Sequence, residues 1–186
     1  MSFYKETEFE SNGYNCIVIF GIHGHRCGYV GVPEGHPLFK KTYSEPCSCL
    51  PYEDVKDESQ DKRGIIPWIL TAMRPDEENG MRPDTYFNVH GSITFSDFNP
   101  QCSDPDDTRW YFGFDCGHAG DANDFETAFK YGLIDEKGYY MRKQFTSIYH
   151  VTYGIHRTLE YCIEECKSLA AQLAEVEKKS RLHDSQ

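Results

Sequence analysis

The chain has 186 residues, eight cysteines and a formal net charge of −11. This length suits one domain with a core large enough to fold without disulfide or metal cross-links. The acidic charge argues against nucleic acid and anionic membranes as partners, because both bind mainly through Lys and Arg. The acidic N-terminal stretch is unlike a signal peptide, and no segment approaches the roughly 18 apolar residues of a membrane span. We therefore expect a single cytosolic domain, residues 1–186, with reduced cysteines.

Two strands are predicted near the N-terminus. Residues 14–20 (YNCIVIF) are rich in β-branched and apolar side chains, and a second extended piece covers residues 27–33. Residues 40–83 then become acidic and turn-prone, except for the apolar island IIPWILTAM at residues 65–73. We expect this part to be an inserted, mostly surface segment whose island docks on the core.

The clearest strand pattern lies in the middle of the chain, at residues 89–95 and 110–115. Antiparallel pairing with His90 opposite Asp115 would gather the apolar side chains on one face of the sheet. The other face would then carry polar groups and a tyrosine: His90, Ser92, Thr94, Tyr111 and Asp115. This pairing predicts one core face and one polar face, although the linker is longer than the roughly 2–5 residues of a tight hairpin loop.

The C-terminal third predicts three elements. Residues 124–131 are expected to form a short helix capped by Asp124, and residues 144–153 to form a further strand. Apolar residues then recur at three- and four-residue steps from Leu159 to Val176, which indicates an amphipathic helix followed by a frayed tail at 179–186. The chain should thus be a two-layer α+β fold, with an antiparallel sheet of about four or five strands covered by the C-terminal helix.

The first candidate site comprises His90, Asp115, His118 and Asp121. A glycine-containing turn after Asp115 could bring His118 and Asp121 back over the strand end. Imidazole and carboxylate groups that converge in this way bind a metal ion with an open position, act as general acid and base, or recognise a polar ligand. A purely structural role is also open, with Asp115 accepting a hydrogen bond from His90 and Asp121 capping a turn.

Secondary candidates lie in the His-rich loop and among the cysteines. His23, His25 and Cys27 alternate, so an extended chain would present all three on one side, where they could bind metal. Cys116 is a further candidate beside Asp115. A less specific alternative is a structural zinc site built from four distant cysteines. These are Cys47, Cys49, Cys102 and Cys116.

Four segments resemble a family of small, mostly uncharacterised proteins encoded by bacteriophages and prophages. They are GHRCGYVGVPEGHPLF from Gly24, VHGSITFS from Val89, WYFGFDCGHAGD from Trp110 and RTLEYCIEECKSLAAQL from Arg157. The family pattern has a second Gly where this chain has Ser92, and an Ala where it has Gly117. The resemblance implies an accessory protein made in the cytoplasm of the bacterial host.

Three functions remain open at this point. The first, suggested by the resemblance, is binding of a small molecule or host protein to interfere with a host process such as antiviral defence. The second is a metal-dependent hydrolase whose His and Asp residues hold a divalent ion such as zinc. The third is a structural or host-interaction module without a chemical site. An anionic substrate would need a local basic pocket, for which Arg26 and Arg109 are the candidates.

Overall fold

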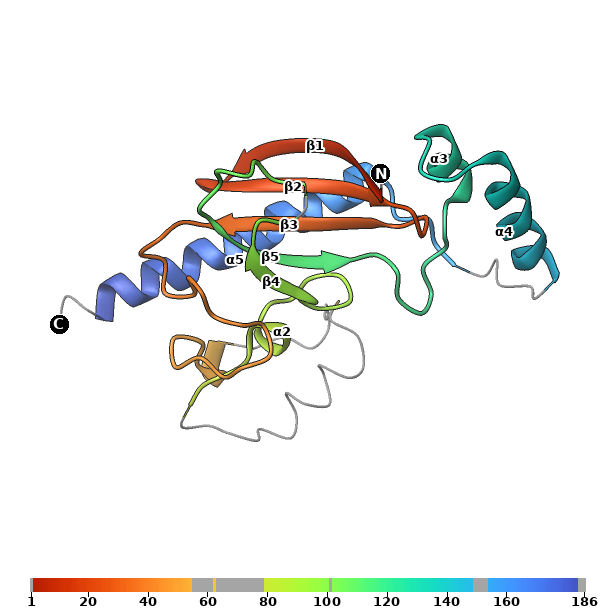
Figure 1. Cartoon of the computed structure of the whole chain (residues 1–186). Helices are drawn as coiled ribbons and strands as arrows, with labels where there is room; N and C mark the ends of the chain where they lie inside the picture. Colours follow the sequence, from red (N-terminus) through yellow and green to blue (C-terminus); the bar gives the residue numbers. More distant parts are fainter. Residues whose placement is uncertain (1, 55–61, 63–78, 101, 149–153, 184–186) are drawn as a thin grey trace.

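The computed structural model describes residues 2–54, 62, 79–100, 102–148 and 154–183. Five strands form one antiparallel sheet in the order β1-β2-β3-β5-β4. The long helix α5 (Leu159–His183) packs against one face of this sheet (Figure 1). The predicted α+β architecture, an antiparallel sheet covered by the C-terminal helix, is therefore confirmed.

The three central strands, β2, β3 and β5, are largely buried, and the two edge strands, β1 and β4, carry polar side chains. The strands are β1 (Phe3–Ser11), β2 (Tyr14–Gly21), β3 (Arg26–Val32), β4 (Phe95–Phe98) and β5 (Trp110–Asp115). Sequence reasoning missed β1, because this edge strand carries charged side chains at its exposed positions. Asn12 and Gly13 join it to β2 in a two-residue turn with φ values of 51° and 83°, which Asn-Gly pairs favour.

The sheet buries both of its faces. The face under α5 carries the larger core cluster, in which Phe112 and Phe114 pack near Cys166 and Leu169. The opposite face was predicted to be polar, and that prediction is wrong. Tyr111 is fully buried there with Ile17, Ile19 and Cys102. Its hydroxyl donates to Asp107 at 2.5 Å and accepts from Asn15 at 2.9 Å, so the phenol is satisfied inside an apolar layer.

The predicted strand at residues 89–95 is also wrong, since β4 begins only at Phe95. Gly91 and Ser92 have φ values of +66° and +90°, which a strand cannot accommodate. The pairing with β5 is antiparallel, as expected, but it joins Phe95 to Gly113, a register three residues away from the predicted one. The segment that carries His90 is thereby a turn that projects toward α5 instead of a rung of the sheet.

The helices of the C-terminal third agree in part with the sequence. The short helix α3 (Phe125–Lys130) begins at Asp124, whose side chain accepts from the backbone N–H of Thr127 at 2.9 Å, as predicted. The strand predicted at 144–153 is wrong, because α4 (Glu136–Ile148) is a helix and residues 149–153 lie outside the described part. Asp135 caps α4 by accepting from Gly138, a signal that the short alternation after Gln144 obscured.

The two described ends of the segment 40–83 lie side by side, because Cys47 and Leu50 are hydrogen-bonded to Met81. It includes the turn η1 (Tyr52–Asp54) and leads into the short helix α2 (Pro83–Tyr86). Cys47 donates its backbone N–H to Met81, and Met81 donates to Leu50 at 2.7 Å. Leu50 and Met81 are buried in the core cluster under α5. The apolar island at residues 65–73 lies outside the described residues.

None of the helices described is long and apolar enough to cross a membrane.

Candidate metal centre

Three segments that are distant in sequence meet beside the N-terminal end of α5. The turn before β4 supplies His90, the loop after β5 supplies His118 and Asp121, and α5 supplies Tyr161. The donor atoms of His90, His118 and Asp121 all lie within 4.8 Å of one another. Three of the four residues of the first predicted site are thus brought together.

His90 is held on three sides. Its Nε2 lies 2.8 Å from Asp121 Oδ2, and its Nδ1 lies 3.1 Å from the hydroxyl of Tyr161. Its backbone N–H donates to the buried carboxylate of Glu165 at 3.0 Å, and Glu165 also pairs with Lys62 at 2.6 Å. These contacts fix both the position and the orientation of the imidazole in a site where the residue is only 8 % exposed.

Asp121 links His90, His118 and Arg157 through its two carboxylate oxygens. Oδ1 accepts from Arg157 Nε at 2.7 Å, and Oδ2 accepts from the backbone N–H of His118 at 3.0 Å. Burial alone would raise the pKa of this carboxyl group, but the hydrogen bonds from Arg157 and His90 outweigh it and lower the pKa. Asp121 is therefore an anion at neutral pH, the form that binds metal ions. A bridge between Asp121 and Ile155 brings Arg157 into place.

His118 lies directly over Gly91. A Cβ atom built on Gly91 would come within 2.1–2.6 Å of three ring atoms of His118, so only glycine fits there. The Nδ1 atom of His118 is buried and makes no hydrogen bond with the described residues. Its nearest acidic neighbour is Asp115, whose Oδ1 lies 3.6 Å away. An unsatisfied buried nitrogen is costly, which suggests a partner that completes the site.

Asp115 lies beside the cluster and not within it. The expected hydrogen bond from His90 to Asp115 is absent, because His90 bonds to Asp121 instead. Asp115 Oδ2 accepts from Thr94 and Oδ1 accepts from the backbone N–H of Gly117, both at 3.0 Å. Its carboxylate is thus held in the orientation that faces His118.

The secondary candidates separate into two environments. His23 and His25 lie in the turn between β2 and β3, with nearly parallel rings 6.1 Å apart. Cys27 does not share that side, because it packs against the buried face that contains Tyr111, and burial raises the pKa of its thiol to about 12. Cys116 lies 3.5 Å from Cys162, and the hydrogen bond between the two thiols, with burial, raises the pKa of Cys116. Neither thiol is therefore a ready thiolate ligand.

The four-cysteine zinc site is not formed. Cys47 and Cys116 belong to the core cluster under α5, with Cys49 packed against it, whereas Cys102 lies in the cluster on the opposite face. A sheet separates Cys102 from the others, so the four thiols cannot share one ion. The expected basic pocket is not formed either. Arg26 is paired with Glu6, and Arg109 is paired with a neighbouring aspartate.

Sequence reasoning missed Arg157, which lies two residues before α5, and two residues of α5 itself. Tyr161 and Glu165 are spaced by four residues, so they lie on one side of the helix. Arg157 stacks over the ring of Tyr161 at 4.8 Å. The four-residue spacing of Tyr161 and Glu165 beside the apolar stripe was the available signal for these two residues.

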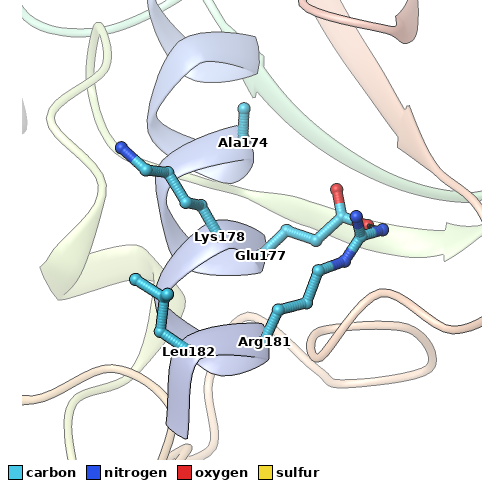
Figure 2. A pocket seen from close by; sticks show the side chains of 5 residues that line it. All are labelled: Ala174, Glu177, Lys178, Arg181 and Leu182. Atoms are coloured by element: carbon cyan, nitrogen blue, oxygen red, sulfur yellow. Dashed lines mark hydrogen bonds and ion pairs between the residues drawn. The ribbon is translucent and has the colours of Figure 1, made fainter. Parts of the chain in front are cut away.

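A surface hollow lies elsewhere on α5. It has a volume of about 380 Å³ and is lined by Ala174, Glu177, Lys178, Arg181 and Leu182 near the C-terminal end of α5 (Figure 2). Figure 2 shows these side chains lying along the surface of the helix, with Glu177 and Arg181 directed toward each other. Tyr161 lies more than three helical turns away along the same helix. This hollow has no part in the His–Asp cluster.

No family model, curated protein or solved structure matches this chain. The assignment of the site therefore rests on the geometry above. Two imidazoles and one carboxylate, all held by neighbouring groups, form the donor set of open catalytic metal sites. The same groups without an ion would form a His–Asp pair that orients Tyr161.

Proposed function

We propose that this protein is a metal-dependent hydrolase whose divalent ion, such as zinc, is bound by His90, His118 and Asp121. The observation that carries the proposal is the convergence of three donor atoms within 4.8 Å beside a buried, unbonded imidazole nitrogen. Three protein ligands leave a coordination position for water, which separates catalytic zinc sites from closed structural ones.

The groups around the three ligands support this reading. Ligating histidines usually donate their second ring N–H to an oxygen atom, which fixes the ring. His90 has the Tyr161 hydroxyl at 3.1 Å for this purpose. The unbonded Nδ1 of His118 is the atom available to the ion, because Asp115 at 3.6 Å is too far away for a hydrogen bond. Asp121 would keep its bonds to Arg157 through Oδ1 and to the backbone N–H of His118 through Oδ2. The lone pair of Oδ2 that faces His90 would bind the ion. His90 and Asp121 therefore each have a supporting residue.

The chemistry follows from the open position. A divalent ion held by His90, His118 and Asp121 would lower the pKa of a bound water, so that hydroxide would be available near neutral pH, and it would polarise the ester bond under attack. The protein contributes the ligand geometry and keeps Asp121 ionised through Arg157.

Zinc binding and hydrolysis test the proposal together. Chelator-treated protein should bind zinc in calorimetric titration and, once loaded, hydrolyse members of a panel of chromogenic carboxylic and phosphate esters. His118→Gln should lose both properties, while replacement of the exposed His156 by Gln should keep them. Zinc binding that survives in both His90→Gln and His118→Gln would overturn the proposal.

We also propose a second function, that of a phage accessory protein that binds a host protein in the bacterial cytoplasm. The exposed side of α4 favours it, because Tyr140, Met141 and Phe145 are each more than half exposed on one helix. Clustered exposed apolar side chains mark interaction sites. Lys137 and Lys143 flank them in an otherwise acidic chain, so the fitting partner is an acidic protein.

The second function is tested by cross-linking in the bacterial host followed by identification of the linked peptides. Cross-links from α4 to one acidic host protein, lost in a Met141→Glu/Phe145→Glu variant, would support it. Cross-links that are unchanged in this variant, or that avoid α4, would contradict it.

A further inference from the structure

We propose that the substrate of the His–Asp site is a phosphate monoester, and that Arg157 binds its phosphate group beside the ion. This inference rests on the proposed function, because it names the substrate class of the same site. The observation that carries it is the contact of Arg157 with Asp121, which uses one guanidinium nitrogen and leaves the other two available.

The guanidinium of Arg157 is only partly engaged. Its Nε donates to Asp121 Oδ1 at 2.7 Å, and its Nη1 and Nη2 make no hydrogen bond with the described residues. The side chain of Arg157 is 23 % exposed, whereas that of Asp121 is 3 % exposed. The guanidinium therefore lies between a buried carboxylate and the solvent. Since arginine stays protonated in proteins, the ligand that fits these N–H groups is an anion.

Two other arginines differ from Arg157 in this respect. Arg26 donates from Nε and Nη2 to the two carboxylate oxygens of Glu6, and from Nη1 to the backbone oxygen of Arg157. Arg109 donates from Nε and Nη2 to the two carboxylate oxygens of Asp107. Both are bidentate pairs, which engage one whole edge of the guanidinium. The carboxylate partner of Arg157 takes only Nε, so its Nη1–Nη2 edge can still form such a pair.

The position of Arg157 is fixed by the chain around it. Ile155, two residues earlier, donates its backbone N–H to Gly120 O at 2.9 Å and accepts from Ala122 N–H at 3.1 Å. The guanidinium itself lies 4.8 Å from the centre of the Tyr161 ring. A side chain that is held in this way loses little conformational freedom when it binds a ligand, which favours binding.

Asp121 connects the guanidinium to the ion position. Its Oδ1 accepts from Arg157, and its Oδ2 lies 2.8 Å from His90 Nε2 within the group of donor atoms proposed for the ion. The two positive centres would therefore lie at the two oxygens of one carboxylate. A phosphate monoester has three non-bridging oxygens, so two can pair with Nη1 and Nη2 while the third binds the ion. An uncharged carboxylic ester has no such anionic group.

The charge around the site favours the same substrate class. The chain carries a net charge of −11, which repels anions from most of its surface. Beside the cluster, Arg157 pairs with Asp121 and Lys62 pairs with Glu165. A divalent ion would add two positive charges to these neutralised pairs, so the site would attract a phosphate group.

The reaction is the hydrolysis of the phosphate ester bond. The oxygen of a hydroxide ion bonds to phosphorus, and the ester P–O bond breaks with its electron pair on the departing oxygen. That oxygen takes a proton from water, so the products are an alcohol and inorganic phosphate. Arg157 would stabilise the negative charge on the phosphate oxygens during this step. Because inorganic phosphate keeps those oxygens, it should also bind to the site.

Phosphate binding to zinc-loaded, full-length protein tests the role of Arg157. In calorimetric titration, inorganic phosphate should bind wild type, and should bind Arg157→Gln at least about tenfold more weakly, because the charged N–H donors are lost. Arg181→Gln is the matched control and should bind like wild type, since Arg181 also pairs with a carboxylate of α5, that of Glu177. Circular dichroism and zinc content verify the fold and the loading of each variant.

Arg157→Lys gives a second variant. Its ammonium keeps the charge without the bidentate edge, so phosphate affinity should lie between those of wild type and Arg157→Gln. If Arg157→Gln does not fold or retain zinc, the comparison uses Arg157→Lys, which should still bind phosphate more weakly than wild type at equal zinc content.

Substrate preference separates anion binding from a structural role. The ratio of kcat/KM for nitrophenyl phosphate to kcat/KM for nitrophenyl acetate should fall at least about tenfold in Arg157→Gln and stay unchanged in Arg181→Gln. If Arg157 only positioned Asp121, loss of zinc would lower both rates together and leave the ratio unchanged.

The outcomes distinguish this inference from the proposed function. No zinc bound by wild type would overturn both. Zinc-dependent hydrolysis of nitrophenyl acetate without binding of phosphate or hydrolysis of nitrophenyl phosphate would overturn the phosphate monoester and leave the hydrolase. Equal phosphate affinity and an equal kcat/KM ratio in wild type and Arg157→Gln would overturn the role of Arg157.

Discussion

Gly91→Ala is the sharpest perturbation of the site that leaves every proposed ligand in place. Gly91 has φ of +66°, and its added Cβ would lie 2.1 Å from His118 Cε1. Carbon atoms pack at about 3.5–4.0 Å, so the imidazole must move by more than about 1 Å. Gly132 is a matched control, with φ of +69° and nothing within 4 Å of its built Cβ.

The two substitutions share the backbone cost and differ in the contact. An alanine in the left-handed region costs about 1–2 kcal/mol, so both variants should lose that much free energy of unfolding in urea. Only Gly91→Ala displaces His118, and its zinc dissociation constant should rise by about 10- to 100-fold, as when a supporting group of a metal site is lost. Zinc titration in competition with a chromogenic chelator measures the difference.

Equal zinc affinities in Gly91→Ala and Gly132→Ala would refute this reasoning, because they would show that the position of His118 does not matter to the ion. A loss of affinity in both variants would point to general destabilisation. The expected pattern is a loss of stability of at least about 1–2 kcal/mol in both variants and a loss of zinc affinity in Gly91→Ala alone.

Two further predictions concern the core. Burial lowers the pKa of His36, whose Nδ1 accepts from Leu38 N–H while Nε2 donates to Leu173 O. As the pH falls, the unfolded chain therefore takes up the proton before the folded protein does. The free energy of unfolding should then decrease as the pH drops below about 6.5, by up to about 1.4 kcal/mol per pH unit. Urea unfolding of His36→Gln should show a flatter pH dependence, and an unchanged slope would contradict this. Gly28→Ala would place Cβ 2.5 Å from the ring of Phe114 and should cost about 1–3 kcal/mol; thermal unfolding like that of wild type would refute the close packing.

The fold was predictable where the periodicity was long or the sequence strongly apolar. The stripe from Leu159 to Val176 spans several turns, so α5 could be read directly from its three- and four-residue steps. Trp110–Asp115 was likewise evident as a strand. The charged edge strand β1 and helix α4 were not, because tertiary contacts and a cap at Asp135 decide those segments.

The candidate site was predictable in its residues more than in its geometry. His118 and Asp121 follow the end of a strand, and that position drew attention to them. The predicted register of residues 89–95 was wrong and paired His90 with Asp115. In the structure the positive φ angles of Gly91 and Ser92 form a turn, and His90 bonds to Asp121 instead. Arg157 was missed because its role depends on a contact between segments 36 residues apart, which no local pattern reveals.

The most direct test of the central claim is elemental analysis of protein purified without chelators or a His tag. Wild type should retain zinc, manganese or iron. His90→Gln, His118→Gln and Asp121→Asn should each lose the ion that these three residues bind, and Asp106→Asn should keep it. Circular dichroism should show the folded state in the variants compared. Wild-type protein without metal, or equal metal content in the three ligand variants, would contradict the account.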